Sequence, residues 1–166
     1  MDRHLCTPGP EALIELYGLV PLPREGGRFR QTWLGAQRPD GRPEGTAILM
    51  LLTAEPGDFS ALHRLPADEV WHFYTGDPLS LFLLPEDGPA RTVVLGPDVL
   101  GGQQVQFTVA AGTWMAAEVA GGGAWTLFGC TMAPGFTYED YEHGDAAELA
   151  ARFPREAARI AELSRP

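Results

Sequence analysis

Cysteine is scarce in this sequence. Only Cys6 and Cys130 are present, far apart and without the CxxC or similar spacing of a zinc site. The pair therefore predicts neither a disulfide framework nor a cysteine metal centre. Long apolar runs are missing too: no stretch approaches the ~20 residues that a membrane-spanning helix needs, and the first residues lack the apolar core of a signal peptide. We expect a cytoplasmic protein with no membrane partner.

Positive charge is the second shortage. Arginine and lysine together number 12 against 22 aspartates and glutamates, which leaves a formal net charge of −10. A nucleic-acid-binding protein gathers basic residues on one face to neutralise phosphates. Nucleic acid is therefore not an expected partner here, because the basic residues are scattered. The one loose group is interpreted as solvated surface: Arg24, Arg28, Arg30, Arg38 and Arg42.

Apolar residues are plentiful by comparison. At 45% they suffice for a packed core, and the length suits a single domain over residues 1–166. Between about residues 27 and 134, short β-rich runs alternate with Gly, Pro and Asp. Such spacing, without a helical period, predicts an all-β fold that is an antiparallel sandwich or barrel. The eight runs are RFRQTWLG, TAILMLLT, DEVWHFYTG, LSLFLLPE, RTVVLG, QVQFTVA, TWMAAEV and AWTLFGCTM.

A short helix is predicted before the β region. Thr7 is a candidate cap, and Pro8 or Pro10 falls in the first turn, where proline is tolerated. Gly18 ends the segment, because glycine readily adopts the left-handed conformation that closes a helix. Three residues form its apolar face: Leu13, Ile14 and Tyr17.

The tail, about residues 145–164, is predicted to be helical again. Asp145, followed three residues later by Glu148, resembles a capping box. Pro154 interrupts the segment, so we predict two short helices rather than one. Four apolar side chains are expected to pack on the β region: Leu149, Phe153, Ile160 and Leu163.

The stretch SALHRLPADEVWHFYTG, residues 60–76, concentrates two of the four histidines with a glutamate and three aromatic residues. Read with Gly57 upstream, its spacing places His63, Leu65, Glu69 and Gly76 in order. This resembles the first motif of the cupin superfamily, G-x5-H-x-H-x3/4-E-x6-G. The departure is Leu65, which occupies the position of the second metal-binding histidine.

The stretch VAAGTWM, residues 109–115, resembles the second cupin motif. Gly112 matches the central glycine of that motif, whereas Ala110 stands at its proline and Met115 at its metal-binding histidine. Two of the four usual metal ligands of a cupin are therefore missing. A tightly bound metal needs three or four suitable ligands, so we expect no resident metal and no other cofactor.

Three separated segments narrow the resemblance to one group of cupins. HRLPADEVWHFYTGDPLSLFLL, LGPDVLGGQQVQFTVAAGTW and GCTMAPGFTYEDYEHGDAAELAARFP are similar to the uncharacterised DUF985, or cupin-5, family. The similarity runs from about Leu13 to Pro154. It implies a jelly-roll barrel, also called a double-stranded β-helix, with short terminal helices, and a homodimer.

Strand alternation orients the side chains of the first motif. His63 and Leu65 share one face, and in the next strand Glu69 shares a face with Trp71 and Phe73. If His63 points into the barrel, as the cupin resemblance implies, an acid–base pair lies in an aromatic-lined cavity. Burial and proximity then shift both pKa values, which suits general acid–base catalysis near neutral pH.

We therefore predict His63 and Glu69 as catalytic residues. A wider set is predicted to contact a small-molecule ligand: Trp71, Phe73, Phe82, Gln104, Thr113, Trp114 and Met115. His72 falls on the opposite strand face, where a surface or interface role is favoured over catalysis. His4 and His143 lie outside the β region and are expected in solvent.

Three functions agree with this pattern. The leading hypothesis is a metal-independent isomerase or epimerase that moves a proton on a sugar-like or carbonyl-bearing metabolite. A second is a ligand-binding protein without chemistry, which uses the same cavity. A third is a metal-dependent oxygenase or lyase with a reduced ligand set.

Overall fold

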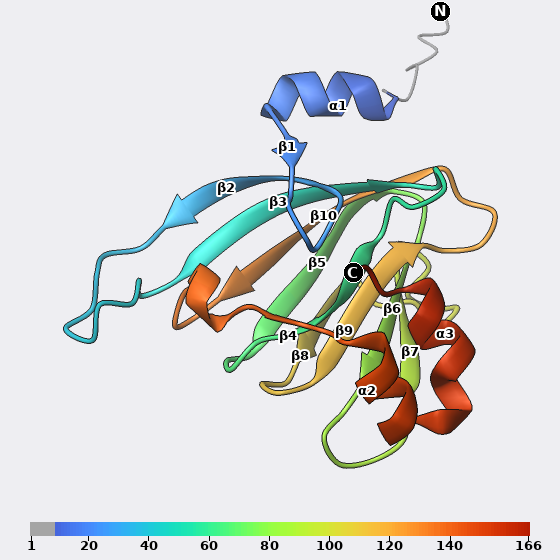
Figure 1. The fold of residues 1–166 in the computed structure, drawn as a ribbon. Coiled ribbons are helices and arrows are strands. Elements are labelled where there is room, and N and C mark those ends of the chain that lie inside the picture. The colour runs from blue at the N-terminus through green and yellow to red at the C-terminus, as the bar shows by residue number, and fades with distance from the viewer. Residues whose placement is uncertain (1–8) are drawn as a thin grey trace, which may run out of the picture.

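The computed structural model describes residues 9–166, which form two antiparallel β-sheets that face each other (Figure 1). The larger sheet has the order β1-β2-β3-β10-β5-β8 and the smaller β11-β4-β9-β6-β7. The strands are β1 Val20–Pro21, β2 Arg28–Leu34, β3 Thr46–Thr53, β4 Ser60–Arg64, β5 Glu69–Gly76, β6 Leu79–Leu84, β7 Arg91–Leu95, β8 Gln106–Val109, β9 Trp114–Val119, β10 Trp125–Met132 and β11 Glu142–His143.

All eight β-rich runs of the sequence form strands, so the prediction of an all-β fold is confirmed. The main core lies between the two sheets and contains the inward side chains of both, among them Met50, Leu81 and Phe128. The side chains of these three residues are fully buried. This burial fixes the register of the strands, because a slip by one residue would turn the buried side chains of a strand toward solvent.

Helix α1, Pro10–Tyr17, lies across the outer face of the larger sheet (Figure 1). Its N-cap is Gly9, and Thr7 lies outside the described residues. Gly18 ends the helix as predicted, with φ of 60° and an N–H that donates to carbonyls of the last turn. Leu13 packs with Leu51 and Leu127, so α1 covers the outward side chains of β3 and β10.

The tail forms α2 Ala146–Arg152, a short 3-10 turn η2 Pro154–Glu156 and α3 Ala157–Glu162. The N–H of Glu148 donates to the Asp145 carboxylate at 2.9 Å, which confirms the predicted cap. The predicted break at Pro154 is confirmed as well. All four predicted apolar side chains of the tail pack on outward residues of the smaller sheet, including Phe82 and Trp114.

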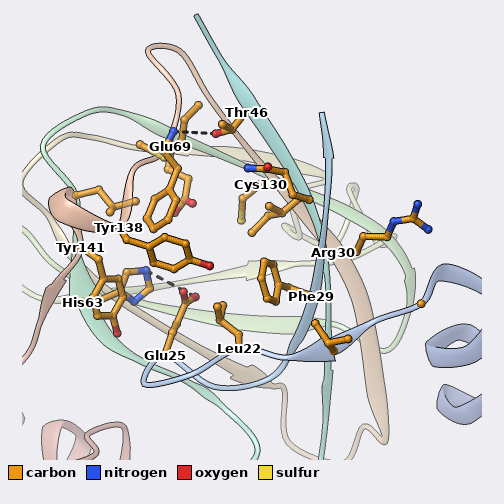
Figure 2. A pocket seen from close by; sticks show the side chains of 17 residues that line it. Leu22, Glu25, Phe29, Arg30, Thr46, His63, Glu69, Cys130, Tyr138 and Tyr141 are labelled. Atoms are coloured by element: carbon orange, nitrogen blue, oxygen red, sulfur yellow. Dashed lines mark hydrogen bonds and ion pairs between the residues drawn. The ribbon is translucent and has the colours of Figure 1, made fainter. Parts of the chain in front are cut away.

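The segment between the sheets and the tail contains a second 3-10 turn, η1 Tyr138–Asp140, directly before β11. It carries the chain from the end of β10 back across the barrel to pair with β4. This return brings Tyr138 and Tyr141 to one end of the barrel (Figure 2). No helix within residues 9–166 combines the length and the apolar character that crossing a bilayer requires.

Candidate active site

A cavity of about 320 Å³ lies at this end of the barrel, between the two sheets (Figure 2). One part of its wall is apolar, formed mainly by Leu22, Phe29, Ile48, Met132 and Phe136. The other part gathers titratable side chains that come from distant segments: Glu25, His63, Glu69, Cys130 and Tyr141. The volume is at the small end of the range for ligand pockets in proteins, so the cavity suits a small molecule.

His63 lies in the middle of β4 and points into the barrel, as predicted. Its side chain is 2% exposed, and its Nδ1 lies 2.7 Å from the carbonyl oxygen of Ala61. A carbonyl only accepts hydrogen bonds, so Nδ1 carries the hydrogen and donates. Nε2 is therefore the nitrogen that gains or loses a proton, and it lies 3.8 Å from Oε1 of Glu25.

Glu25 belongs to the tight loop between β1 and β2. Its Oε1 accepts a hydrogen bond of 2.8 Å from Ser60 Oγ, and its backbone carbonyl accepts from the Ala61 N–H at 2.7 Å. The same carbonyl accepts from the Arg165 guanidinium, which comes from the C-terminal end of the chain. Ala61 thus donates its N–H to Glu25 and accepts at its carbonyl from His63. These two bonds place the side chains of Glu25 and His63 beside each other.

The prediction from sequence missed Glu25. It lies in the polar, glycine-rich stretch PREGG, which reads as an ordinary turn and is separated from His63 by two strands. No pattern in the sequence marks the site; in the structure the neighbouring Arg24, a non-glycine residue, adopts a positive φ of 64°. That conformation is uncommon for a residue with a side chain and is visible only in the structure.

Glu69 is the first residue of β5 and is 7% exposed. The pKa of its carboxyl is raised from 4.5 to about 7, mainly by burial and in part by the nearby Glu25. His63 opposes this shift, as do hydrogen bonds from Trp71 and Cys130. The Trp71 indole N–H donates to Oε2 at 3.0 Å. Near neutral pH the carboxyl is therefore present in both protonation states, which a general acid or base requires.

His63 and Glu69 line the same cavity, as predicted, but the ion-pair partner of His63 is Glu25. Their catalytic roles stay predictions. Cys130 lines the cavity next to Glu69, and burial raises the pKa of its thiol well above the ordinary value. The Cys130 side chain is therefore a neutral donor rather than a thiolate nucleophile.

Tyr141 closes the cavity beside His63. Their rings are stacked, with centroids 5.4 Å apart and planes inclined by 19°. Burial raises the pKa of the Tyr141 phenol, which keeps the hydroxyl protonated. That hydroxyl lies 2.8 Å from Nδ1 of His143, and Nε2 of His143 lies 3.0 Å from the carbonyl of Arg165. Since this carbonyl only accepts, Nε2 carries the hydrogen and the Tyr141 hydroxyl donates to Nδ1.

The expectation that His143 lies in solvent is corrected by these bonds. The residue belongs to β11, is half-buried and is held at both ring nitrogens, because β11 pairs with β4 beneath the C-terminal segment. His4 lies outside the described residues. His72 points away from the cavity as predicted, and its Nε2 lies 2.8 Å from Thr131 Oγ1.

The seven predicted ligand contacts lie outside the cavity lining, which differs from the prediction. Trp71 and Met115 are each 1% exposed in the core behind the cavity, where Trp71 stacks on Phe128 with centroids 5.3 Å apart. Phe73 packs against the same core. As strand alternation predicted, these side chains point inward. The interior of the barrel is filled with side chains at their position, so they pack behind the cavity wall.

The remaining four are separated from the cavity by the smaller sheet or by loops. Phe82 and Trp114 point outward and are covered by the C-terminal helices. Thr113 lies in the turn before β9, and Gln104 forms a bridge with Leu95 at the surface. Each of these positions has the wrong parity or lies beyond the strand that would aim it inward.

The metal implied by the cupin resemblance does not fit this donor set. Leu65 lines the cavity at the position of the second histidine ligand, and Met115 is directly opposite His63 in the β4–β9 register. Neither side chain offers a nitrogen or oxygen ligand. Residues 9–166 contain no group of three histidine, cysteine, aspartate or glutamate side chains that could hold a metal ion.

Comparison with known proteins agrees with this fold. The sequence model of the family described as Cupin superfamily (DUF985) matches residues 11–144. A hypothetical protein from Leishmania major is 31% identical with a TM-score of 0.86, over 96% of this chain and 100% of that protein. A protein from Shewanella oneidensis is 32% identical with a TM-score of 0.87, over 96% of this chain and 99% of that one. No curated protein matches the sequence.

More distant structures share the architecture alone. Oxalate decarboxylase from Bacillus subtilis is 17% identical with a TM-score of 0.54, over 87% of this chain and 37% of the decarboxylase. Two antiparallel sheets with short helices near the termini, together with these neighbours, confirm the predicted jelly-roll. On the family match and the two close structures, the chain belongs to the cupin superfamily, in the family designated DUF985.

Proposed function

We propose that this cupin is a metal-independent isomerase or epimerase, which moves a proton on a small carbonyl-bearing metabolite. One observation carries the proposal: a carboxyl with a pKa of about 7, that of Glu69, lines the same small cavity as His63, whose Nε2 has no hydrogen-bond partner within residues 9–166. A group that can give a proton and a group that can take one therefore face the same ligand.

In the proposed reaction, Nε2 of His63 removes the proton from the carbon next to the carbonyl. Glu69 in its protonated form donates its proton to the carbonyl oxygen, which gives a neutral enol. Return of a proton to carbon and loss of the hydroxyl proton to Glu69 restore a carbonyl compound. Return from His63 to the neighbouring carbon of an enediol gives an isomer, and return from His63 to an enol that has turned its other face toward the imidazole gives an epimer.

The surroundings support each role. The carboxylate of Glu25, 3.8 Å from Nε2, stabilises the imidazolium that forms when His63 takes the proton. The Ala61 carbonyl fixes the orientation of the imidazole, as a second acceptor does for many catalytic histidines. Enclosure of the cavity by apolar residues strengthens these charge interactions relative to those in water.

The test is solvent-deuterium incorporation into a panel of aldoses, ketoses, 2-hydroxyketones, amino sugars and 2-aminoketones, followed by proton NMR. The wild-type protein is expected to exchange one C–H position of at least one compound. His63→Gln and Glu69→Gln are each expected to slow the exchange by about 100-fold or more, the usual contribution of a general acid or base. Glu55→Gln, which changes an exposed carboxylate away from the cavity lining, is the matched control.

Two outcomes would contradict the proposal. In the first, the substrate exchanges equally fast with the His63→Gln variant. In the second, no panel compound exchanges faster than in protein-free buffer, while thermal-shift titration shows that one binds. That second result would favour the ligand-binding alternative.

A further inference from the structure

The end of the cavity formed by Glu25 and His63 presents hydrogen-bond acceptors. Nε2 of His63 in its neutral form has a free lone pair, because Nδ1 carries the hydrogen. Glu25 accepts from Ser60 at Oε1, and residues 9–166 make no hydrogen bond to its Oε2. Of the potential donors nearby, the Tyr141 hydroxyl is committed to His143. A ligand head group at Glu25 and His63 must therefore supply the donors itself. Donors to other parts of a ligand are available elsewhere in the lining, from protonated Glu69, Gln31, Thr46 and Tyr138.

Permanent positive charge is missing from the same place. The chain has no lysine, so arginine is the only such cation available. Arg30 is the single arginine of the cavity lining, and its Nη1 donates to the Tyr17 carbonyl at 3.1 Å on the exposed rim. Figure 2 shows its guanidinium turned away from Glu25 and His63. An anionic ligand would thus find no bidentate arginine partner, the usual means of binding carboxylate or phosphate.

Two further arginines lie close to the cavity but behind its wall. Arg24 stacks on the Tyr141 ring at 5.5 Å, and Arg165 donates to the Glu25 backbone carbonyl and stacks on Phe59 at 4.0 Å. Both line a separate surface hollow rather than the cavity. Their positive charges partly offset the negative potential of the Glu25 carboxylate, but neither guanidinium donates to a ligand in the cavity.

We infer that the ligand is a small amine, with an ammonium group held by the Glu25 carboxylate and an apolar body against the Phe29 and Phe136 wall. An ammonium brings three donors and one positive charge to this acceptor-rich end. The ring of Tyr138, which lines the same cavity, adds an aromatic surface that favours a cation. A carboxylate or phosphate group is disfavoured at this end of the cavity, because it would lie against the Glu25 carboxylate without an arginine partner.

The inference deepens the proposed function and rests on the use of the same cavity. Nε2 of His63 lies 3.8 Å from Oε1 of Glu25. An ammonium bound to Glu25 would therefore place the carbon that bears it beside Nε2. The substrate would then be an amino-carbonyl compound, with its reacting C–H between the two groups. Glu69 stays available for the carbonyl oxygen, because the ammonium is anchored by the other carboxylate.

The experiment uses three probes that share one apolar body: 3-phenylpropylamine, 3-phenylpropan-1-ol and 3-phenylpropanoate. Equilibrium binding to the full-length protein is measured by calorimetry at pH 7. The amine is expected to bind about tenfold or more tightly than the alcohol, as a charge-assisted hydrogen bond provides. The carboxylate is expected not to bind. Glu25→Gln should lower the affinity for the amine about tenfold and leave that for the alcohol unchanged.

Glu55→Gln removes the same charge from the surface and should alter none of the three affinities. The inference is overturned if the carboxylate binds as tightly as the amine, if the alcohol equals the amine, or if none of the probes binds. It is also overturned if Glu25→Gln leaves the preference for the amine intact. Binding needs no turnover, so an amine preference without deuterium exchange would refute only the proposed chemistry, and exchange without an amine preference only the ligand class.

Discussion

Oε1 of Glu25 lies 3.8 Å from Nε2 of His63, and both residues are hydrogen-bonded to Ala61, whose N–H donates to the Glu25 backbone carbonyl and whose carbonyl accepts from Nδ1 of His63. The histidine comes from β4 and the glutamate from the loop before β2, so the pair forms only when the two sheets close. When His63 is protonated the two side chains form an ion pair that is largely shielded from water. Together with Glu69, which lines the same cavity, this pair makes up the candidate site.

The first prediction concerns stability against pH. The pKa of Glu69 is about 7 in the folded protein and near 4.5 when unfolded, so the folded state holds this proton more tightly. The resulting stabilisation is fully present below pH 4.5 and is lost as pH rises through 7, by about 3 kcal/mol in all. Glu69→Gln cannot lose a proton and should not show this loss.

Urea denaturation at pH 5 and pH 8 measures the effect. The free energy of unfolding should fall more between these pH values for wild type than for Glu69→Gln. Glu55→Gln serves as the control, since its exposed carboxylate should leave the wild-type slope in place. Equal slopes for wild type and Glu69→Gln would show that Glu69 titrates like an ordinary carboxyl.

The second prediction concerns Trp71. Its indole N–H donates to Glu69 at 3.0 Å and lowers the carboxyl pKa, whereas its ring stacks on Phe128. Trp71→Phe keeps an aromatic ring but removes the donor, so the pKa of Glu69 should rise further. The smaller ring also leaves a void, which should cost about 1–3 kcal/mol of stability.

Carbon-13 NMR of the glutamate side-chain carboxyls reports the pKa directly. Phe128→Leu is the matched control, because it disturbs the stack and retains the indole donor. A pKa of Glu69 that moves equally in both variants would assign the shift to packing rather than to the hydrogen bond.

The third prediction concerns Arg165, which clamps the Glu25 loop from the C-terminal end. Its guanidinium donates to the carbonyls of Glu25 and Gly57 and stacks on Phe59. Arg165→Ala should destabilise the protein by about 1–3 kcal/mol, since hydrogen bonds from a charged group are lost. It should also weaken amine binding, because the loop that carries Glu25 is released.

Thermal unfolding and calorimetric titration with 3-phenylpropylamine measure these two effects. Arg155→Ala is the control, an exposed arginine of the same C-terminal region. Full amine affinity in folded Arg165→Ala would show that the Glu25 loop keeps its position without the clamp.

The fourth prediction concerns Cys130. Its side chain is 4% exposed, and burial with the nearby Glu69 and Glu25 raises the pKa of the thiol well above its ordinary value. The thiolate is the reactive form, so a Cys6→Ser protein should react with a disulfide reagent at pH 7 no faster than it unfolds. The liberated chromophore gives the rate. Rapid stoichiometric reaction of the folded protein would contradict a buried neutral thiol.

Much of this architecture was available from local pattern. The cupin resemblance implied that His63 faces the interior, and alternation along β5 then predicted Glu69 on the interior face and His72 on the exterior; the structure confirms these orientations. Asp145, Pro154 and Gly18 predicted the ends of the helices in the same way. These features depend on backbone stereochemistry and on side-chain parity, both of which operate over a few neighbouring residues.

The partners of the site were decided by the tertiary structure alone. Glu25 and Tyr141 reach His63 through a loop and a returning segment whose paths no local period encodes. The tertiary structure also decided which inward side chains meet the cavity. Trp71 and Met115 point inward as their parity requires, yet they are buried in the core, whereas the cavity is lined in part by residues of β2 and of the η1 segment. Parity fixes the face of a strand on which a side chain lies, whereas packing between sheets fixes whether that face meets a ligand or another side chain.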